Sequence, residues 1–246
     1  MTTRGTRANF SAIDDRLLDG LEFCGKVYDL FEQILGLPDG KRRLRLRKTT
    51  TEKRLVEELL PLARYVQTRY QAGRRIKVRW FGGSQPYDAI IWSSGSLVHR
   101  GVAPRKVFLE ITTAVHPNDH LLRKRLDEHG GSFGVKGIRR EGKETVSEPH
   151  VFSGGENASD LAQQIMRCLD RKAEKKYPPS TVLVINCVPN CMVFEDEWTS
   201  AVEHVRMSTS ITFREVFLLD LQGSHSATLY RNRPEKQLGV PPLRLG

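Results

Sequence analysis

The sequence predicts an α/β protein in which a mixed central β-sheet is flanked by helices. Segments with apolar residues at helical spacing alternate along the chain with shorter apolar runs of strand length. One such run, residues 181–188, is apolar almost throughout, which is the pattern of a strand buried on both faces. The chain has 246 residues, of which 39% are hydrophobic and 28% charged, so it can bury a sizeable core.

The first predicted helix covers residues 12–36, where six apolar side chains recur at helical spacing: Leu17, Leu21, Cys24, Tyr28, Phe31 and Leu35. The Leu-Pro-Asp-Gly segment at 37–40 ends it. Two interpretations stay open for this helix, a separate appendage or an arm that joins copies of the chain into a homo-oligomer. We expect residues 1–50 to form an N-terminal helical arm and a basic linker.

The predicted α/β domain spans residues 51–230 and begins with a helix at about 51–70. Strands are predicted at 75–81, 88–92 and 106–114, separated by a Gly-Gly turn and by a glycine-containing loop. A third helix begins near Pro117 and ends at the glycines that follow His129, because proline favours the first turn and glycine the end of a helix. Residues 130–157 are rich in glycine and charge, which predicts a long loop or hairpin.

The rest of the domain contains one more long helix and the last strands. The helix is predicted at about 158–176, and its basic final residues suit the negative end of the helix dipole. After the strand at 181–188, a short helix is expected at 197–207 and strands at 215–221 and 227–230. Residues 231–246 hold three prolines and no core pattern, so we expect a flexible tail.

The sequence favours a cytoplasmic protein without a membrane partner. No apolar run approaches the roughly 20 residues that span a bilayer, and the first 15 residues lack the apolar core of a secretory signal. Reduced, buried thiols are therefore the expected state of the cysteines. Cys187 and Cys191 are spaced as C-x3-C, but no second Cys/His pair stands near them at zinc-finger spacing, so no zinc site is expected.

Positive charge is concentrated in one part of the chain. Residues 41–79 hold 14 Lys/Arg and 3 Asp/Glu, a balance of +11, whereas the whole chain carries +10. Such a field attracts polyanions, so nucleic acid is the favoured partner and a solvated linker is the alternative. The residues expected to bind nucleic acid are Lys41, Arg42, Arg43, Arg45, Arg47, Lys48, Arg74 and Arg75.

Two carboxylates interrupt apolar strands that follow one another in sequence. Asp88 opens the second predicted strand, and Glu110 lies within the third, on the same face as Phe108 and Thr112. If these strands pair antiparallel, the two carboxylates can sit side by side, where they repel unless a proton or a cation lies between them. Mg²⁺ suits such a site because it takes oxygen ligands and binds through one or two carboxylates plus phosphate.

The order of these elements resembles the PD-(D/E)xK nuclease superfamily, whose members have a restriction-endonuclease-like core. The resemblance covers roughly residues 51–130, through a helix with a glutamate, a strand with Pro86-Tyr87-Asp88, and a strand with Glu110-Ile-Thr112. It implies Mg²⁺- or Mn²⁺-dependent phosphodiester hydrolysis of nucleic acid, with DNA favoured over RNA. It also implies that Glu58, Asp88 and Glu110 are the metal ligands.

The chain departs from the family pattern at one position. Thr112 stands where the family usually has the lysine that positions or activates the attacking water. The following helix supplies Arg123 and Lys124, and by the resemblance one of them would steady the phosphate instead.

Simpler roles remain open for both carboxylates. Asp88 suits the end of a turn, and Glu110 suits an ion pair with an arginine from a neighbouring element. A non-catalytic nucleic-acid-binding or assembly protein on a degenerate nuclease fold is therefore the alternative to an enzyme. A structural protein that binds a partner through residues 12–36 is a third possibility.

Overall fold

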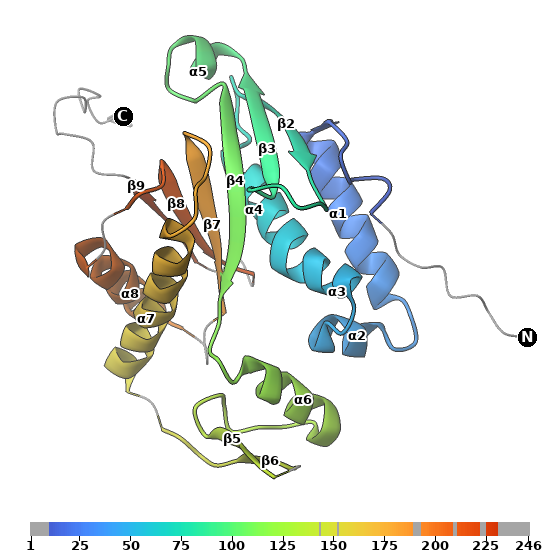
Figure 1. Cartoon of the computed structure of the whole chain (residues 1–246), viewed down its shortest axis with the longest axis vertical. Coiled ribbons are helices and arrows are strands. Elements are labelled where there is room, and N and C mark those ends of the chain that lie inside the picture. Colours follow the sequence, from blue (N-terminus) through green and yellow to red (C-terminus); the bar gives the residue numbers. More distant parts are fainter. Residues whose placement is uncertain are drawn as a thin grey trace, which may run out of the picture.

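A computed structural model describes residues 10–142, 144–151, 153–188, 193–208, 211–221 and 225–230 (Figure 1). Its centre is a seven-stranded sheet in the order β1-β2-β3-β4-β7-β8-β9. Strands β4, β7 and β8 run parallel to one another, and the other neighbours pair antiparallel. The strands are β1 (Leu18–Asp19), β2 (Arg75–Trp80), β3 (Ala89–Ser94), β4 (Lys106–Ala114), β7 (Thr181–Cys187), β8 (Glu215–Asp220) and β9 (Ser226–Tyr230). The predicted α/β class with a mixed, helix-flanked sheet is confirmed.

One face of the sheet packs against a long helical segment and the first helix. The first helix is α1 (Gly20–Leu35), and the segment runs through α3 (Thr50–Arg54), the π-helical turn η1 (Leu55–Leu59) and α4 (Leu60–Arg69). Alternate residues of β2 reach this core, and the side chains of Ile76, Val78 and Trp80 are fully buried there. The wide turn η1 directly precedes Pro61, whose missing N–H interrupts the regular helical ladder.

The other face is covered at the β7–β8 end by α7 (Gly154–Ala173) and α8 (Glu195–Ser208) (Figure 1). Ser153 caps α7 by accepting a hydrogen bond from the backbone N–H of Glu156 at 3.2 Å. Because β4 and β7 are parallel neighbours, α7 is the crossover that carries the chain back to the start of β7. The C-terminal end of α7 therefore returns beside the early part of β4.

Residues 18–46 belong to this fold and are not a separate arm. Strand β1 pairs with β2, and α1 buries its apolar side chains in the core shared with α4. Residues of the predicted linker form the helix α2 (Gly40–Leu46), which packs against α1 and α6 (Asp119–His129). Leu17 and Leu21 stay more than half exposed, so oligomerisation through residues 12–36 stays a prediction.

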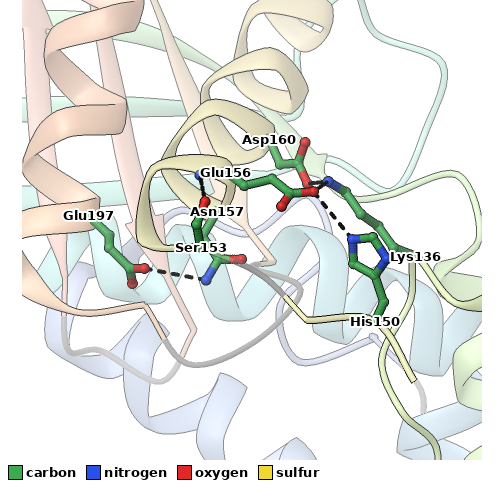
Figure 2. Close-up of polar contacts among 7 residues, drawn as sticks. All are labelled: Lys136, His150, Ser153, Glu156, Asn157, Asp160 and Glu197. Atoms are coloured by element: carbon green, nitrogen blue, oxygen red, sulfur yellow. Dashed lines mark hydrogen bonds and ion pairs between the residues drawn. The ribbon is translucent and has the colours of Figure 1, made fainter.

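The segment between α6 and α7 contains the predicted hairpin, formed by β5 (Ile138–Glu141) and β6 (Glu144–Ser147). Lys136 fastens this segment to α7 (Figure 2), because its Nζ lies 2.7 Å from Glu156 Oε1 and 2.5 Å from Asp160 Oδ2. His150 Nε2 also lies 3.3 Å from Glu156 Oε1. The residue after Glu156, Asn157, donates a hydrogen bond to Glu197 of α8, which joins the two helices.

Two further expectations concern membranes and cysteines. Within the described ranges, no helix is long and apolar enough to cross a membrane. Cys24, Cys168 and Cys187 are buried free thiols, as predicted. Cys191 and the predicted tail at 231–246 lie outside the described residues.

Candidate active site

Asp88 and Glu110 lie close together where two neighbouring strands stop pairing. Strands β3 and β4 pair antiparallel as far as Ala89 opposite Leu109, and Asp88 directly precedes this pair on one strand while Glu110 directly follows it on the other. The backbone N–H of Asp88 donates to the carbonyl of Leu109 at 2.8 Å, so Asp88 and Ala89 both face Leu109, as in a β-bulge. The charge of Glu110 contributes to the raised pKa of Asp88, so the two carboxylates share one small region.

The side chain of Asp88 is held by the backbone of β4. Its Oδ2 accepts a hydrogen bond of 2.7 Å from the N–H of Ile111. Burial raises the pKa of Asp88 to about 7, the negative charge of Glu110 adds to this shift, and the hydrogen bond from Ile111 opposes it. Near neutral pH, therefore, this carboxyl group exchanges its proton readily.

Glu110 is buried, at 7% exposure, and is paired with a lysine that comes from the crossover helix. Lys172 Nζ on α7 forms an ion pair with Glu110 Oε1. The hydroxyl of Tyr177 lies beside the same carboxylate, and burial together with the charge of Glu110 raises the pKa of Tyr177, so the phenol stays protonated. Glu110 thus has the ion pair that the simpler interpretation predicted, but its partner is Lys172 and not an arginine.

Glu58 reaches the same end of the sheet from the π-helical turn η1. Burial raises its pKa, Arg54 and the indole N–H of Trp80 oppose the shift, and Glu57 and Glu110 reinforce it. The charge of Glu58 in turn helps to raise the pKa of Asp88. Three carboxylates therefore influence one another electrostatically at this position.

These carboxylates do not form a complete metal cage. In the part of the chain that the structure describes, no group of three or more His, Cys, Asp or Glu side chains is placed to hold a metal ion. The donor chemistry nevertheless fits Mg²⁺, because Asp88 and Glu110 offer only oxygen atoms and their negative charges lie close enough for Glu110 to add to the burial that raises the pKa of Asp88. Mg²⁺ commonly binds through one or two carboxylates and keeps water or phosphate as its other ligands.

Thr112 and Arg171 lie beside the carboxylates on the same face of β4. The guanidinium Nη2 of Arg171 donates to Thr112 Oγ1 at 3.3 Å. Thr112 is buried, at 8% exposure. Arg171 and Lys172 of α7 thus bring two cationic groups to the side of the site where the resemblance places a lysine at position 112.

The structure places the other predicted phosphate-binding residues elsewhere. Arg123 pairs with Asp119 on its own helix, with Nε 2.8 Å from Oδ2, and Lys124 lies 3.6 Å from Glu128. No contact between either residue and Asp88 or Glu110 is found in the described ranges. Their helix, α6, packs against α2 and β5.

Most of the predicted nucleic-acid-binding arginines are engaged inside the fold. Arg43 pairs with the buried Glu52 at 2.5 Å. Arg42 forms an ion pair with Asp127, and Arg47 forms one with Glu57. Arg45 donates a hydrogen bond to the carbonyl of Leu126. Arg74 corrects the prediction most clearly, because it is only 8% exposed and donates to Ser93 Oγ at 3.2 Å. The exposed members of the predicted set are Lys41, Arg42, Arg45, Lys48 and Arg75.

Lys172 is the site residue that sequence reasoning missed. It was interpreted as one of several basic residues at the negative end of a helix dipole, because their spacing alone does not separate them. Finding Lys172 requires the order of strands in the sheet. Because β4 and β7 are parallel neighbours, the helix that connects them must end beside the early residues of β4.

Comparison with protein-family models, with curated proteins and with solved structures finds no match for this chain. The site is therefore interpreted from its own geometry and chemistry.

Proposed function

We propose that this protein hydrolyses phosphodiester bonds in nucleic acid, DNA in particular, on a restriction-endonuclease-like core with Mg²⁺ or Mn²⁺ at the carboxylate site. The observation that carries the proposal is the contact between Lys172 and Glu110, next to Asp88. It brings a lysine to the carboxylate pair although Thr112 occupies the usual lysine position. The arrangement is thus compatible with the PD-(D/E)xK pattern with its lysine on the crossover helix.

The element order supports the same proposal. A helix carries Glu58, antiparallel strands carry Asp88 and Glu110, and a helical crossover leads to a parallel strand. In this scheme Asp88 and Glu110 hold the metal through their oxygens, and Glu58 contributes from η1. When bound, the metal would lower the pKa of the attacking water and stabilise the leaving oxygen.

The side chains of α7 have the complementary task of placing the anionic substrate. Lys172 is a compact cation beside Glu110, so it can position the attacking water or a phosphate oxygen at the edge of the carboxylate pair. Arg171, held by Thr112, presents a guanidinium on the same side, where it can bind a phosphate through two oxygens.

The test is cleavage of plasmid, single-stranded DNA and RNA with Mg²⁺ or Mn²⁺. We expect Asp88→Asn and Glu110→Gln to lower the rate by at least about 100-fold, and Lys172→Met by about 10²–10³-fold, as for loss of one transition-state contact. Lys26→Met on α1, whose ammonium is paired with Glu22 on its own helix, is the matched control and should cleave like wild type. Metal-independent cleavage, or full activity in Asp88→Asn, would exclude the mechanism.

One observation favours a non-catalytic binding protein as the second candidate. The ion pair with Lys172 already neutralises Glu110, which leaves less negative charge for a metal. That candidate predicts salt-sensitive nucleic-acid binding without cleavage. Isothermal titration with Mg²⁺ separates the two, because only the nuclease requires a binding signal that Asp88→Asn and Glu110→Gln abolish.

A further inference from the structure

The face of β2, β3 and β4 that points away from the α1–α4 core is basic and aromatic. The strand register places Lys77, Trp92 and Lys106 on one row across the three strands. The next row, toward the carboxylates, holds Arg79, Ile90 and Phe108. Asp88 directly precedes β3, and Glu110 lies two residues beyond Phe108 on β4, so the surface leads directly into the candidate active site.

Several side chains on this face of β2, β3 and β4 are exposed to solvent. Arg75, Lys77 and Lys106 are exposed, and Trp92 and Phe108 are half-buried. Helix α7, which covers the same side of the sheet, packs on β4 and β7, and β2 and β3 lie at the end of the sheet away from it (Figure 1). Trp92 and Phe108 therefore keep part of their surface in contact with solvent.

The aromatic side chains form a connected strip. The ring centroids of Tyr87 and Phe108 are 4.8 Å apart, and those of Phe81 and Tyr87 are 5.7 Å apart. Lys106 Nζ lies 4.6 Å from the centroid of Phe108 and 5.7 Å from that of Trp92, so it places a cation on top of the strip. The middle ring of the strip belongs to Tyr87, the residue directly before Asp88.

The net charge of this surface is positive even when the residues neutralised by ion pairs are left out. Arg79 is neutralised by Asp15, with Nη2 2.7 Å from Oδ1. Arg75, Lys77 and Lys106 form no ion pair with another residue in the described ranges, and the ammonium group of Lys106 lies near the rings of Trp92 and Phe108. Exposed cations beside flat rings match a ligand with phosphates and unstacked bases.

We propose that this face binds single-stranded nucleic acid, with bases stacked on Trp92 and Phe108 and phosphates on Arg75, Lys77 and Lys106. Stacking on a sheet surface requires unpaired bases, because a duplex hides the base faces between neighbouring pairs. One part of the proposal rests on the proposed function, namely that the substrate reaches Asp88 and Glu110 as a single strand. Binding itself does not require cleavage.

The test measures binding by fluorescence anisotropy in EDTA, with 20-nucleotide oligo(dT), oligo(rU) and a 20-bp duplex at 50 and 200 mM salt. We expect a single strand to bind at least 10-fold more tightly than the duplex. The double variant Arg75→Glu/Lys77→Glu should weaken single-strand binding at least 10-fold and reduce the salt slope by about 1.4, if each residue contacts one phosphate. Trp92→Leu should weaken it about 5-fold or more with the slope unchanged, because it removes stacking and not charge.

The matched control is Lys26→Glu/Arg206→Glu, the same charge change on α1 and α8, away from this face; it should bind like wild type within twofold. Arg75→Glu/Lys77→Glu alters only exposed charge, so its melting temperature should stay close to that of wild type. If Trp92→Leu fails to fold, the binding of this double variant decides whether the proposal holds.

Equal affinity for duplex and single strand, or no loss in Arg75→Glu/Lys77→Glu, would overturn the proposal. So would binding to anionic phospholipid vesicles without binding to any oligonucleotide. Binding that persists in EDTA while no metal supports cleavage would refute the proposed function and leave this surface assigned.

Discussion

Lys172 on α7 and Glu110 on β4 form an ion pair in which the side chains are only 13% and 9% exposed. They are 62 positions apart in the sequence and meet because the chain crosses over the sheet between parallel strands. The pair neutralises a buried carboxylate and at the same time places a cation at the candidate active site.

The first prediction concerns the stability of this pair. Lys172→Met should lower the free energy of unfolding by about 3–5 kcal/mol, because it leaves the buried Glu110 without a partner. The double variant Lys172→Met/Glu110→Gln should recover much of that loss, because no charge is left buried. Urea denaturation of wild type, both single variants and the double variant gives the coupling energy. A coupling energy near zero would mean that the pair contributes nothing to the fold.

The second prediction is a pH dependence that depends on Asp88. Its pKa is raised from 3.8 to about 7, so between these values the folded protein binds one more proton than the unfolded chain. The free energy of unfolding should therefore fall as pH rises from about 4 to about 7, and the loss should be complete above that range. Asp88→Asn removes the dependence and should stabilise the protein at pH 8 by roughly 2–4 kcal/mol.

Denaturation at pH 5 and pH 8 checks this prediction. The exposed Asp29 on α1 provides the control, because Asp29→Asn should leave the difference between the two pH values as in wild type. An unchanged difference in Asp88→Asn would show that another group is responsible.

The third prediction tests metal binding without an activity assay. Burial and the charge of Glu110 raise the pKa of Asp88, so this carboxyl group must lose its proton before it can hold Mg²⁺. The stabilisation by Mg²⁺ should therefore be larger at pH 8 than at pH 5. At a concentration 100 times the dissociation constant, binding to the folded state adds about 2.7 kcal/mol. Thermal melts with and without Mg²⁺ should show a rise for wild type and none for Glu110→Gln. A rise that persists in Glu110→Gln would place the ion elsewhere.

The fourth prediction concerns the basic helix α2. Glu52 is 1% exposed and accepts hydrogen bonds from Arg43 and from Thr49. Arg43→Ala should destabilise the fold by about 3–5 kcal/mol, because it leaves this carboxylate buried without its cation. Lys41→Ala, an exposed change on the same helix, should stay within about 0.5 kcal/mol of wild type. Similar losses in both variants would mean that α2 is stabilised in another way.

The fifth prediction concerns Lys136, which fastens the β5–β6 segment to α7 through Glu156 and Asp160 (Figure 2). Lys136→Met should lower global stability by only about 1 kcal/mol, because the partners are partly solvated. Amide hydrogen exchange in residues 138–147 should nevertheless become faster than in the strands of the main sheet. Arg206→Met, which removes an exposed pair within α8, should leave that exchange unchanged.

Much of this fold could be predicted from local patterns. The alternation of apolar and polar residues located β2, β3 and β4, and the fully apolar run located β7, because burial imposes those patterns directly. The sequence raised the antiparallel pairing of β3 with β4 as the condition for Asp88 and Glu110 to meet, and the structure shows that pairing.

What the sequence could not show depends on packing between distant elements. The density of positive charge at 41–48 looked like a free basic surface, yet its arginines meet Glu52, Glu57 and Asp127, which lie up to 85 positions away. Lys172 was hidden for the same reason. A charged residue in a sequence gives no sign of whether its partner is solvent, another side chain or a ligand.

The length of α7 has a consequence for how this site can vary. Its 20 residues rise about 30 Å, and the nine residues of β4 span about the same distance. The number of residues in the helix therefore determines which residue of β4 Lys172 reaches. Removing one residue from the middle of α7 would turn Lys172 by about 100° away from Glu110, whereas a change of length at the loop before Ser153 would not. The position of the cation at the carboxylates is thus set by the number of residues in a helix, and insertions and deletions in this chain should be tolerated only outside it.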